Sequence, residues 1–180
     1  MALKATIFKA EVQISDMDRH YYNAHALTIA RHPSETDERM MIRLLAFALY
    51  ADEQLSFTRG LSTVEEPELW RKSLSDEIEL WIDLGQPDER RIRKACGQAQ
   101  QVLIVSYGRS AGPWWEKISP ELNRFANLSV IYIPPEACQA LTRLAERNMQ
   151  LQFTIEDGHV WVSRGEDLIE VIPEHWCKSR

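Results

Sequence analysis

One stretch of the chain, EEPELWRKSLSDEIELWIDLG at residues 65–85, predicts a β-hairpin and decides the fold class. Two short runs flank a polar turn at residues 73–76, and the second run alternates between apolar and polar side chains. Successive side chains of a strand point to opposite faces. One face would therefore carry the apolar residues at 78, 80, 82 and 84, and the other Glu77, Glu79, Trp81 and Asp83.

The hairpin would bring two acidic side chains together. If the two runs pair across the four-residue turn, Glu68 lies opposite Trp81 and is a diagonal neighbour of Asp83, with main chains about 7–8 Å apart. Two carboxylates so placed can share one divalent cation such as Mg²⁺. The same pattern fits an acidic face that lies in water and binds nothing. If the metal site is present, Asp83→Ala is expected to abolish metal binding and to leave the fold almost unchanged, because an acidic surface face tolerates neutralisation.

Strand and helix patterns alternate along the rest of the chain. Strands are expected at residues 4–15, 20–30, 102–105 and 128–133, with further strands in 149–173 around a turn at Asp157-Gly158. Helices are expected from about residue 33 to 52, at 86–97, at 114–125 and at 134–147. This order predicts one domain over residues 1–180, of α/β (α+β) class, with a mixed central β-sheet flanked by helices.

Composition narrows the class of protein. The 180 residues are 44% hydrophobic, which suits a globular domain with a core, and the net charge of −6 argues against a nucleic-acid coat protein. Cys96, Cys138 and Cys177 show no CxxC spacing and are expected to be free thiols, with Cys96 and Cys138 packed as small apolar side chains. No secretory signal or membrane-length apolar run is visible, so we expect a cytoplasmic protein without membrane contact.

Three stretches carry a family resemblance: DMDRHYY at 16–22, RHPSET at 31–36 and WIDLGQP at 81–87. Over essentially its whole length the chain resembles the YaeQ family of small bacterial proteins. That family resembles, in fold, the PD-(D/E)XK nuclease superfamily, as a variation of the restriction-endonuclease-like fold. The resemblance implies a mixed sheet flanked by helices and a Mg²⁺-dependent phosphodiesterase site, with Mn²⁺ as a substitute metal, that acts on nucleic acid.

The superfamily motif can be placed on this chain. Pro67-Glu68 stands where the Pro-acid pair belongs, and Asp83-Leu84-Gly85 stands where the acid-any-Lys triplet belongs. The resemblance thus implies Glu68, Asp83 and the carbonyl of Leu84 as metal ligands. The chain departs from the motif at Gly85, because a glycine can neither polarise a water nor stabilise a leaving oxyanion.

Other residues are candidates for the remaining catalytic roles. The superfamily often adds an acid from the first helix, and Glu38 or Glu35 could fill that role. Gln86 or Lys94 could replace the missing lysine. Each has an ordinary explanation as well, since Gln86 could cap the helix before Pro87 and Lys94 could be a solvated charge.

A basic cluster completes the candidate site. Its members are Arg90, Arg91, Arg93 and Lys94, which could bind phosphates without reading bases. Complementarity to the helix dipole and i,i+4 ion pairs would explain the same charges.

Three functions remain open at this point. The first is a divergent metal-dependent nuclease. The second is a binding or regulatory protein that keeps the nuclease-like fold without turnover, with nucleic acid or an unknown protein as partner. The third leaves the acidic face in solvent and places the function elsewhere.

Overall fold

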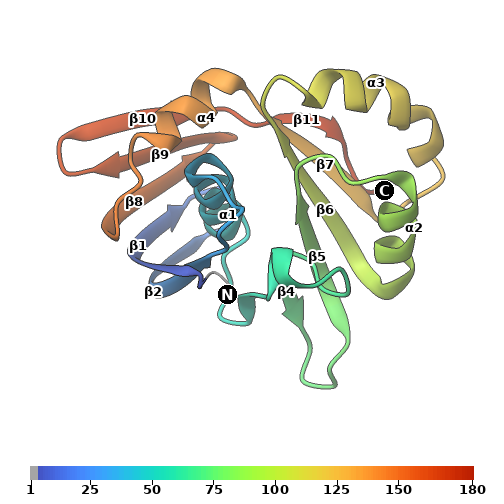
Figure 1. Cartoon of the computed structure of the whole chain (residues 1–180), viewed down its shortest axis with the longest axis horizontal. Coiled ribbons are helices and arrows are strands. Elements are labelled where there is room, and N and C mark those ends of the chain that lie inside the picture. The colour runs from blue at the N-terminus through green and yellow to red at the C-terminus, as the bar shows by residue number, and fades with distance from the viewer. Residues whose placement is uncertain (1–3) are drawn as a thin grey trace. The chain divides into compact units, whose positions relative to one another are not determined.

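The computed structural model of the chain describes residues 4–180 and contains two compact units. Unit 1 comprises residues up to 51 together with 136–173, and unit 2 comprises 52–135 together with 174–180. Figure 1 labels the elements of both. None of the helices within residues 4–180 has both the length and the apolar character needed to cross a membrane.

Unit 1 is built on a five-stranded sheet in the order β10-β9-β8-β1-β2. Its strands are β1 (Thr6–Asp16), β2 (Tyr21–Arg31), β8 (Asn148–Glu156), β9 (His159–Arg164) and β10 (Asp167–Val171), and its helices are α1 (Asp37–Leu49) and most of α4 (Pro135–Thr142). Strand β1 pairs antiparallel with β2 and parallel with β8. Every second residue of β1 is buried, and α1 covers that face with a run of nine buried residues (Figure 1). The alternation therefore places the core between this face and the helix.

One aspartate joins the two hairpin turns of unit 1. The carboxylate of Asp18, in the β1–β2 turn, accepts the backbone N–H of Asp157 at 2.7 Å and that of Gly158 at 2.9 Å, both in the β8–β9 turn. The bond from Gly158, followed by that from Asp157, lowers the pKa of Asp18 against a smaller opposing effect of burial. The ionised carboxylate is thus the form that the fold prefers.

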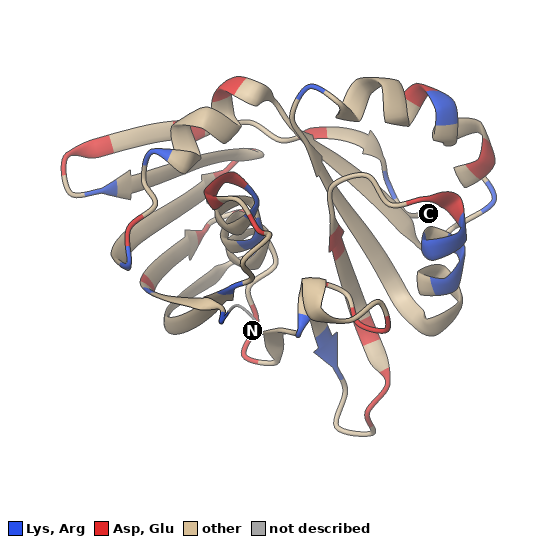
Figure 2. Cartoon of the chain, in the orientation of Figure 1, with Lys and Arg blue, Asp and Glu red and all other residues tan. Residues whose placement is uncertain are grey.

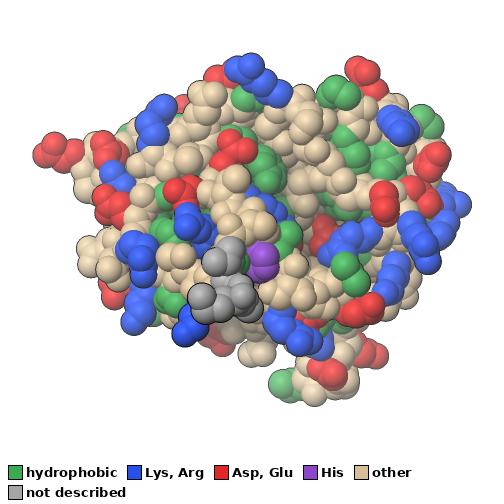
Figure 3. All heavy atoms as spheres, viewed as in Figure 1, with side chains coloured by type: hydrophobic (Ala, Val, Ile, Leu, Met, Phe, Trp, Pro, Cys, Tyr) green, Lys and Arg blue, Asp and Glu red, His purple; other side chains and the backbone are tan. Residues whose placement is uncertain are grey.

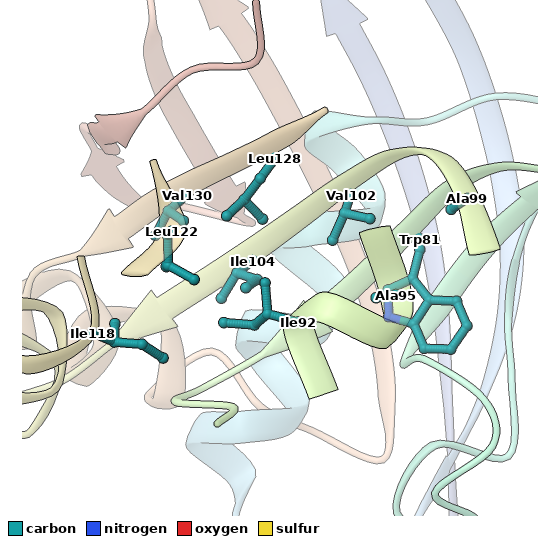
Figure 4. Close-up of a cluster of buried hydrophobic side chains, with 10 residues drawn as sticks. All are labelled: Trp81, Ile92, Ala95, Ala99, Val102, Ile104, Ile118, Leu122, Leu128 and Val130. Carbon is teal, nitrogen blue, oxygen red and sulfur yellow. The ribbon is translucent and has the colours of Figure 1, made fainter. Parts of the chain in front are cut away.

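Unit 2 contains a six-stranded sheet in the order β11-β7-β6-β5-β4-β3. The strands are β3 (Leu55–Phe57), β4 (Leu69–Lys72), β5 (Ile78–Leu84), β6 (Ala99–Tyr107), β7 (Leu128–Ile133) and β11 (Glu174–Cys177), with helices α2 (Glu89–Gln98) and α3 (Ala111–Leu122). Strands β5, β6 and β7 are parallel, and α2 and α3 are the crossovers between them. Figure 4 shows a core cluster of this unit, which contains Trp81 of β5 together with apolar side chains from α2, α3, β6 and β7.

The structure confirms the mixed α+β class and corrects the arrangement of the sheet. Two mixed sheets are present in place of one central sheet. The physical reason is that β8 pairs in parallel with β1, so that the N-terminal hairpin and residues 148–171 complete a sheet of their own. Strand β11 joins the second sheet through β7. The expectation of a single domain over residues 1–180 stays a prediction.

Some element boundaries also differ from the expected ones. Residues 55–57, where no element was expected, form the short strand β3, and the helix expected at 134–147 ends at Thr142. The helix expected at 114–125 begins earlier, at Ala111. The helix expected at 86–97 and the hairpin turn at Asp157-Gly158 are confirmed.

The Asp18 contact predicts a pH-dependent stability. Because the folded pKa of Asp18 lies below its ordinary value of 3.8, its stabilising effect is complete above that pH and is lost as the pH falls through the folded pKa. Asp18→Asn should therefore be less stable than the wild type at neutral pH, and the difference should shrink below that value. Urea denaturation between pH 7 and pH 2 gives the free energy of unfolding of both proteins.

The control for this series is Glu156→Gln, which removes an exposed acid from the same hairpin. Its stability should follow that of the wild type across the titration. A constant difference between Asp18→Asn and the wild type at every pH would contradict the assignment.

Candidate functional site

The register of the β4–β5 hairpin differs from the predicted one. Trp70, and not Glu68, lies opposite Trp81, and Leu69 pairs with Ile82. Glu68 directly precedes β4, and its backbone N–H donates to the carbonyl of Ile82 at 2.9 Å. The prediction that Glu68 faces Trp81 is wrong, and Glu68 instead lies beside the carboxyl end of β5, where Asp83 is found.

The turn of the hairpin accounts for one residue of this two-residue shift, and a bulge in β5 accounts for the other. Arg71 pairs with Leu80 but the next residue, Lys72, pairs with Ile78, so that Glu79 is an extra residue on β5. The side chain of Arg71 donates to the Glu79 carboxylate at 3.0 Å. A sequence with an unbroken alternation gives no sign of such an insertion.

The two acids are buried. Glu68 is 5% exposed and Asp83 is 3% exposed, whereas Glu77 at the turn is exposed. The interpretation of an acidic face in water is therefore wrong for Glu68 and Asp83. A buried carboxylate is costly unless hydrogen bonds or a counter-charge compensate for the loss of water.

Arg91 supplies that counter-charge for Asp83. Its Nε donates to Oδ2 at 2.9 Å and its Nη2 donates to Oδ1 at 3.0 Å, so each carboxylate oxygen accepts from the same guanidinium. Arg91 also donates to the carbonyls of Val64 at 3.0 Å and Glu66 at 3.1 Å. The Asp88 side chain caps α2 by accepting the backbone N–H of Arg91 at 2.8 Å. One guanidinium thus joins the start of α2, the end of β5 and the loop before β4.

The ionisation of Arg91 reflects both acids. Burial alone would lower the pKa of Arg91, but the hydrogen bond to Asp83 and the charges of Asp83, Glu68 and Asp88 outweigh it and raise the pKa. Arg91 is therefore a permanent cation. The contribution of Glu68 places its negative charge within electrostatic reach of the same guanidinium.

Glu68 lies against the backbone of Gly60. A side-chain carbon on Gly60 would lie 2.5 Å from Oε2 of Glu68, and Gly60 has a positive φ of 49°. The N–H of Gly60 donates to the hydroxyl of Thr58 at 2.9 Å, which holds this turn in place. Glycine is required here for both reasons, the close approach and the left-handed conformation.

This arrangement does not fit a bound Mg²⁺ without movement of Arg91. Both oxygens of Asp83, the acid expected to bind the metal together with the Leu84 carbonyl, accept from Arg91. Within residues 4–180, no group of three or more His, Cys, Asp or Glu side chains could hold a metal ion. The assignment of Glu68, Asp83 and Leu84 as metal ligands stays a prediction.

The candidates for the lysine role have other partners. Gln86 donates to the carbonyl of Tyr107 at 3.3 Å and accepts from the Ser110 hydroxyl at 3.0 Å, so its amide joins the ends of β5 and β6. Lys94 forms an ion pair with Glu65 at 3.1 Å on the surface. Catalytic roles for Gln86 and Lys94 stay predictions.

The acids expected from the first helix belong to unit 1, whereas Glu68 and Asp83 belong to unit 2. Glu38 lies in the first turn of α1. Glu35 is buried and accepts from Arg39 and Arg43, each at 2.7 Å. The carboxylate of Glu35 therefore holds the start of α1.

The cations of α2 are accompanied by acids. Arg90, Arg93 and Lys94 are exposed, and Arg93 pairs with Glu89 at 3.2 Å. Figure 2 shows blue and red positions together on the ribbon of α2, and Figure 3 shows blue and red side chains close together in this region. The surface charge of α2 is therefore mixed.

The cysteines are free, as expected. Burial, with a further effect of Cys177, raises the pKa of Cys96 to about 11. The Cys96 thiol therefore stays protonated at neutral pH, which agrees with packing and not with nucleophilic chemistry.

Two features of the site were missed by sequence reasoning. Arg91 was expected only as a phosphate ligand, although the helix start at Pro87 already placed it three residues after the cap Asp88. Gly60 was not among the residues that the sequence singled out for the site. Their partners lie across the hairpin and could not be read from local spacing.

Comparison with known proteins assigns the family. The family model described as YaeQ protein matches residues 1–173. The chain belongs to the YaeQ family. It is 51% identical to the uncharacterized protein YaeQ of Salmonella typhi and 50% identical to that of Escherichia coli (strain K12), each over 98% of both chains.

Two solved structures of the YaeQ family have the same fold. The crystal structure of the YaeQ protein from Xanthomonas axonopodis pv. citri superimposes with a TM-score of 0.94 at 46% identity, over 98% of this chain and 99% of that one. The YaeQ protein from Pseudomonas syringae superimposes with a TM-score of 0.93 at 36% identity, over 97% of each chain.

The Arg91–Asp83 pair reverses the expectation that neutralising Asp83 barely affects the fold. Asp83→Ala should lower the free energy of unfolding by about 2–4 kcal/mol, because it leaves a partly buried guanidinium without its carboxylate. Glu77→Ala, on the same hairpin but exposed, should change the free energy of unfolding by less than about 0.5 kcal/mol. Urea denaturation measures both variants. Equally small effects would show that the pair does not stabilise the fold.

Proposed function

We propose that the chain is a nuclease-like protein that binds nucleic acid without hydrolysing it. The observation that carries the proposal is the bidentate pair between Asp83 and Arg91. If the YaeQ family is a variant of the PD-(D/E)XK superfamily, Asp83 is the motif acid. In this chain an internal cation already satisfies both of its oxygens, which favours retention of the fold over retention of the chemistry.

The backbone at Gly85 supports the same conclusion. Gly85 stands at the lysine position of the motif, and its φ is +87°. Side-chain-bearing residues rarely adopt this conformation, so a lysine at this position would be strained. The chain therefore departs from the motif in two ways: it lacks the lysine side chain, and its backbone at Gly85 has a conformation that disfavours a lysine.

The exposed cations of α2 are the basis for a nucleic-acid partner. Arg90, Arg93 and Lys94 lie on its solvent side, in or close to the first two turns of the helix. Arg93 pairs with Glu89 and Lys94 pairs with Glu65, and surface ion pairs of this kind have a small net energy. The phosphates of a nucleic acid could therefore compete with these two acids for the cations. Such binding is electrostatic and does not depend on base sequence.

Fluorescence anisotropy tests this proposal with labelled single-stranded DNA, duplex DNA and RNA of mixed sequence. The wild type should bind at low salt and lose affinity as salt rises, since each phosphate contact releases counterions. Arg90→Gln/Arg93→Gln should weaken binding about tenfold or more and reduce the salt slope by about 2. The matched control is Lys117→Gln/Arg143→Gln, which removes the same charge from exposed positions on α3 and after α4.

Two results would contradict the proposal. One is no binding of any of the three probes at low salt. The other is an equal loss in the control variant, which would show that only net charge matters.

A second candidate, Mg²⁺-dependent phosphodiester hydrolysis, is favoured by one observation. Two buried carboxylates, those of Glu68 and Asp83, act on one guanidinium. Incubation of the labelled strands with Mg²⁺ or Mn²⁺ separates the candidates. Cleavage that is present in the wild type and absent in Glu68→Gln/Asp83→Asn would select hydrolysis, and intact strands under conditions of binding would select the first proposal.

A further inference from the structure

The free edges of the two sheets differ greatly in length. Among residues 4–180, the edge strands β3, β11 and β10 have three, four and five residues. Strand β2, at the remaining edge, has eleven. Proteins usually keep edge strands short or interrupt them, because their unpaired N–H and C=O groups offer a template for another strand. Strand β2 is the exception (Figure 1).

The hydrogen bonds of β1 show which residues of β2 face the open edge. The N–H of Lys9 donates to the carbonyl of Arg147, on the side of β1 that faces β8. The neighbouring residues of β1 therefore direct their backbone groups toward β2, since this direction alternates along an antiparallel pair. In the register of the pair, the even-numbered residues of β2 then face outward: Tyr22, Ala24, Ala26, Thr28 and Ala30.

Two side-chain contacts agree with this assignment. The N–H of Ala24 donates to the side-chain oxygen of its neighbour Asn23 at 2.9 Å, and the carbonyl of Ala30 accepts from Arg43 at 3.2 Å. Both groups belong to outward-facing residues. Arg43 thus occupies the backbone carbonyl at the Ala30 end of the edge, and the segment from Tyr22 to Thr28 is the part available for pairing.

This segment lacks the usual protection of an edge. No proline, lysine, arginine or acid occurs between Tyr22 and Ala30, and the register with β1 is unbroken from one end of β2 to the other. All five outward-facing residues are exposed. Four of the five are alanine or threonine, so Tyr22 at one end is the one bulky side chain that a neighbouring strand at about 4.8 Å would meet among them.

We propose that β2 pairs antiparallel with β2 of a second copy of this chain, which would join the two five-stranded sheets into one. A second copy is the occupant that the segment fits, because an uncharged strand opposite itself places no like charges together. A two-fold axis also makes every contact self-complementary. Pairing from Tyr22 to Thr28 leaves the Arg43–Ala30 contact in place and requires only the exposed Asn23 side chain to release the Ala24 N–H.

Sedimentation and light scattering of the full chain over a range of concentrations test this proposal. The wild type should reach twice the 20.9 kDa mass of one chain. Ala26→Pro removes an N–H that the β1–β2 ladder does not use, and Thr28→Lys places a charge on the edge. Each should raise the dissociation constant of the dimer about tenfold or more, which places both variants as monomers at concentrations where the wild type is dimeric.

The control is Gln150→Lys on β8, an interior strand of the same sheet, which should leave the mass unchanged. Thermal unfolding shows which variants are folded. If Ala26→Pro does not fold, the mass of Thr28→Lys alone tests the proposal. A monomeric wild type up to millimolar concentration would overturn the proposal. A dimer that persists in folded Thr28→Lys would also overturn it.

Discussion

The ion pair between Arg91 and Asp83 is the interaction on which the candidate site depends. Asp83 lies at the end of β5 with almost no exposure, and a carboxylate in that position is tolerated only with a counter-charge or donors. The guanidinium of Arg91 provides both and uses its remaining donors on the loop before β4. The same contact therefore holds three segments together.

The rest of the site follows from this contact. Glu68 lies within electrostatic reach of the guanidinium and packs against Gly60, where only a glycine leaves room for its carboxylate. Gly85 ends β5 in a left-handed conformation that disfavours a lysine. Acids at such positions can thus be structural as well as chemical, and Asp83 has a structural role here through its pair with Arg91. Both proposals made for this chain concern exposed surfaces instead, the cations of α2 and the backbone edge of β2.

The sequence predicted the parts of the fold that rest on local patterns. The strand at 78–84, the helix after Pro87 and the turn at Asp157-Gly158 each depend on neighbouring residues, and all three are confirmed. The parallel pairing of β1 with β8 could not be predicted from the sequence, because it joins distant segments through backbone hydrogen bonds that any strand can make. The bulge at Glu79 shifted Glu68 by a register step that no alternation could reveal. The sequence located both acids of the site but not their partner, since Arg91 reaches Asp83 only once α2 has packed beside β5.

The most direct test of this account is a double-mutant cycle between Asp83 and Arg91. Asp83→Ala, Arg91→Ala and the double variant are unfolded in urea beside the wild type, and the coupling free energy is taken from the four midpoints and slopes. The account predicts a favourable coupling of about 1–3 kcal/mol, because each single variant leaves a charged partner without its counter-charge. A coupling within about 0.3 kcal/mol of zero would mean that the two residues act independently, and it would contradict the view that this pair organises the site.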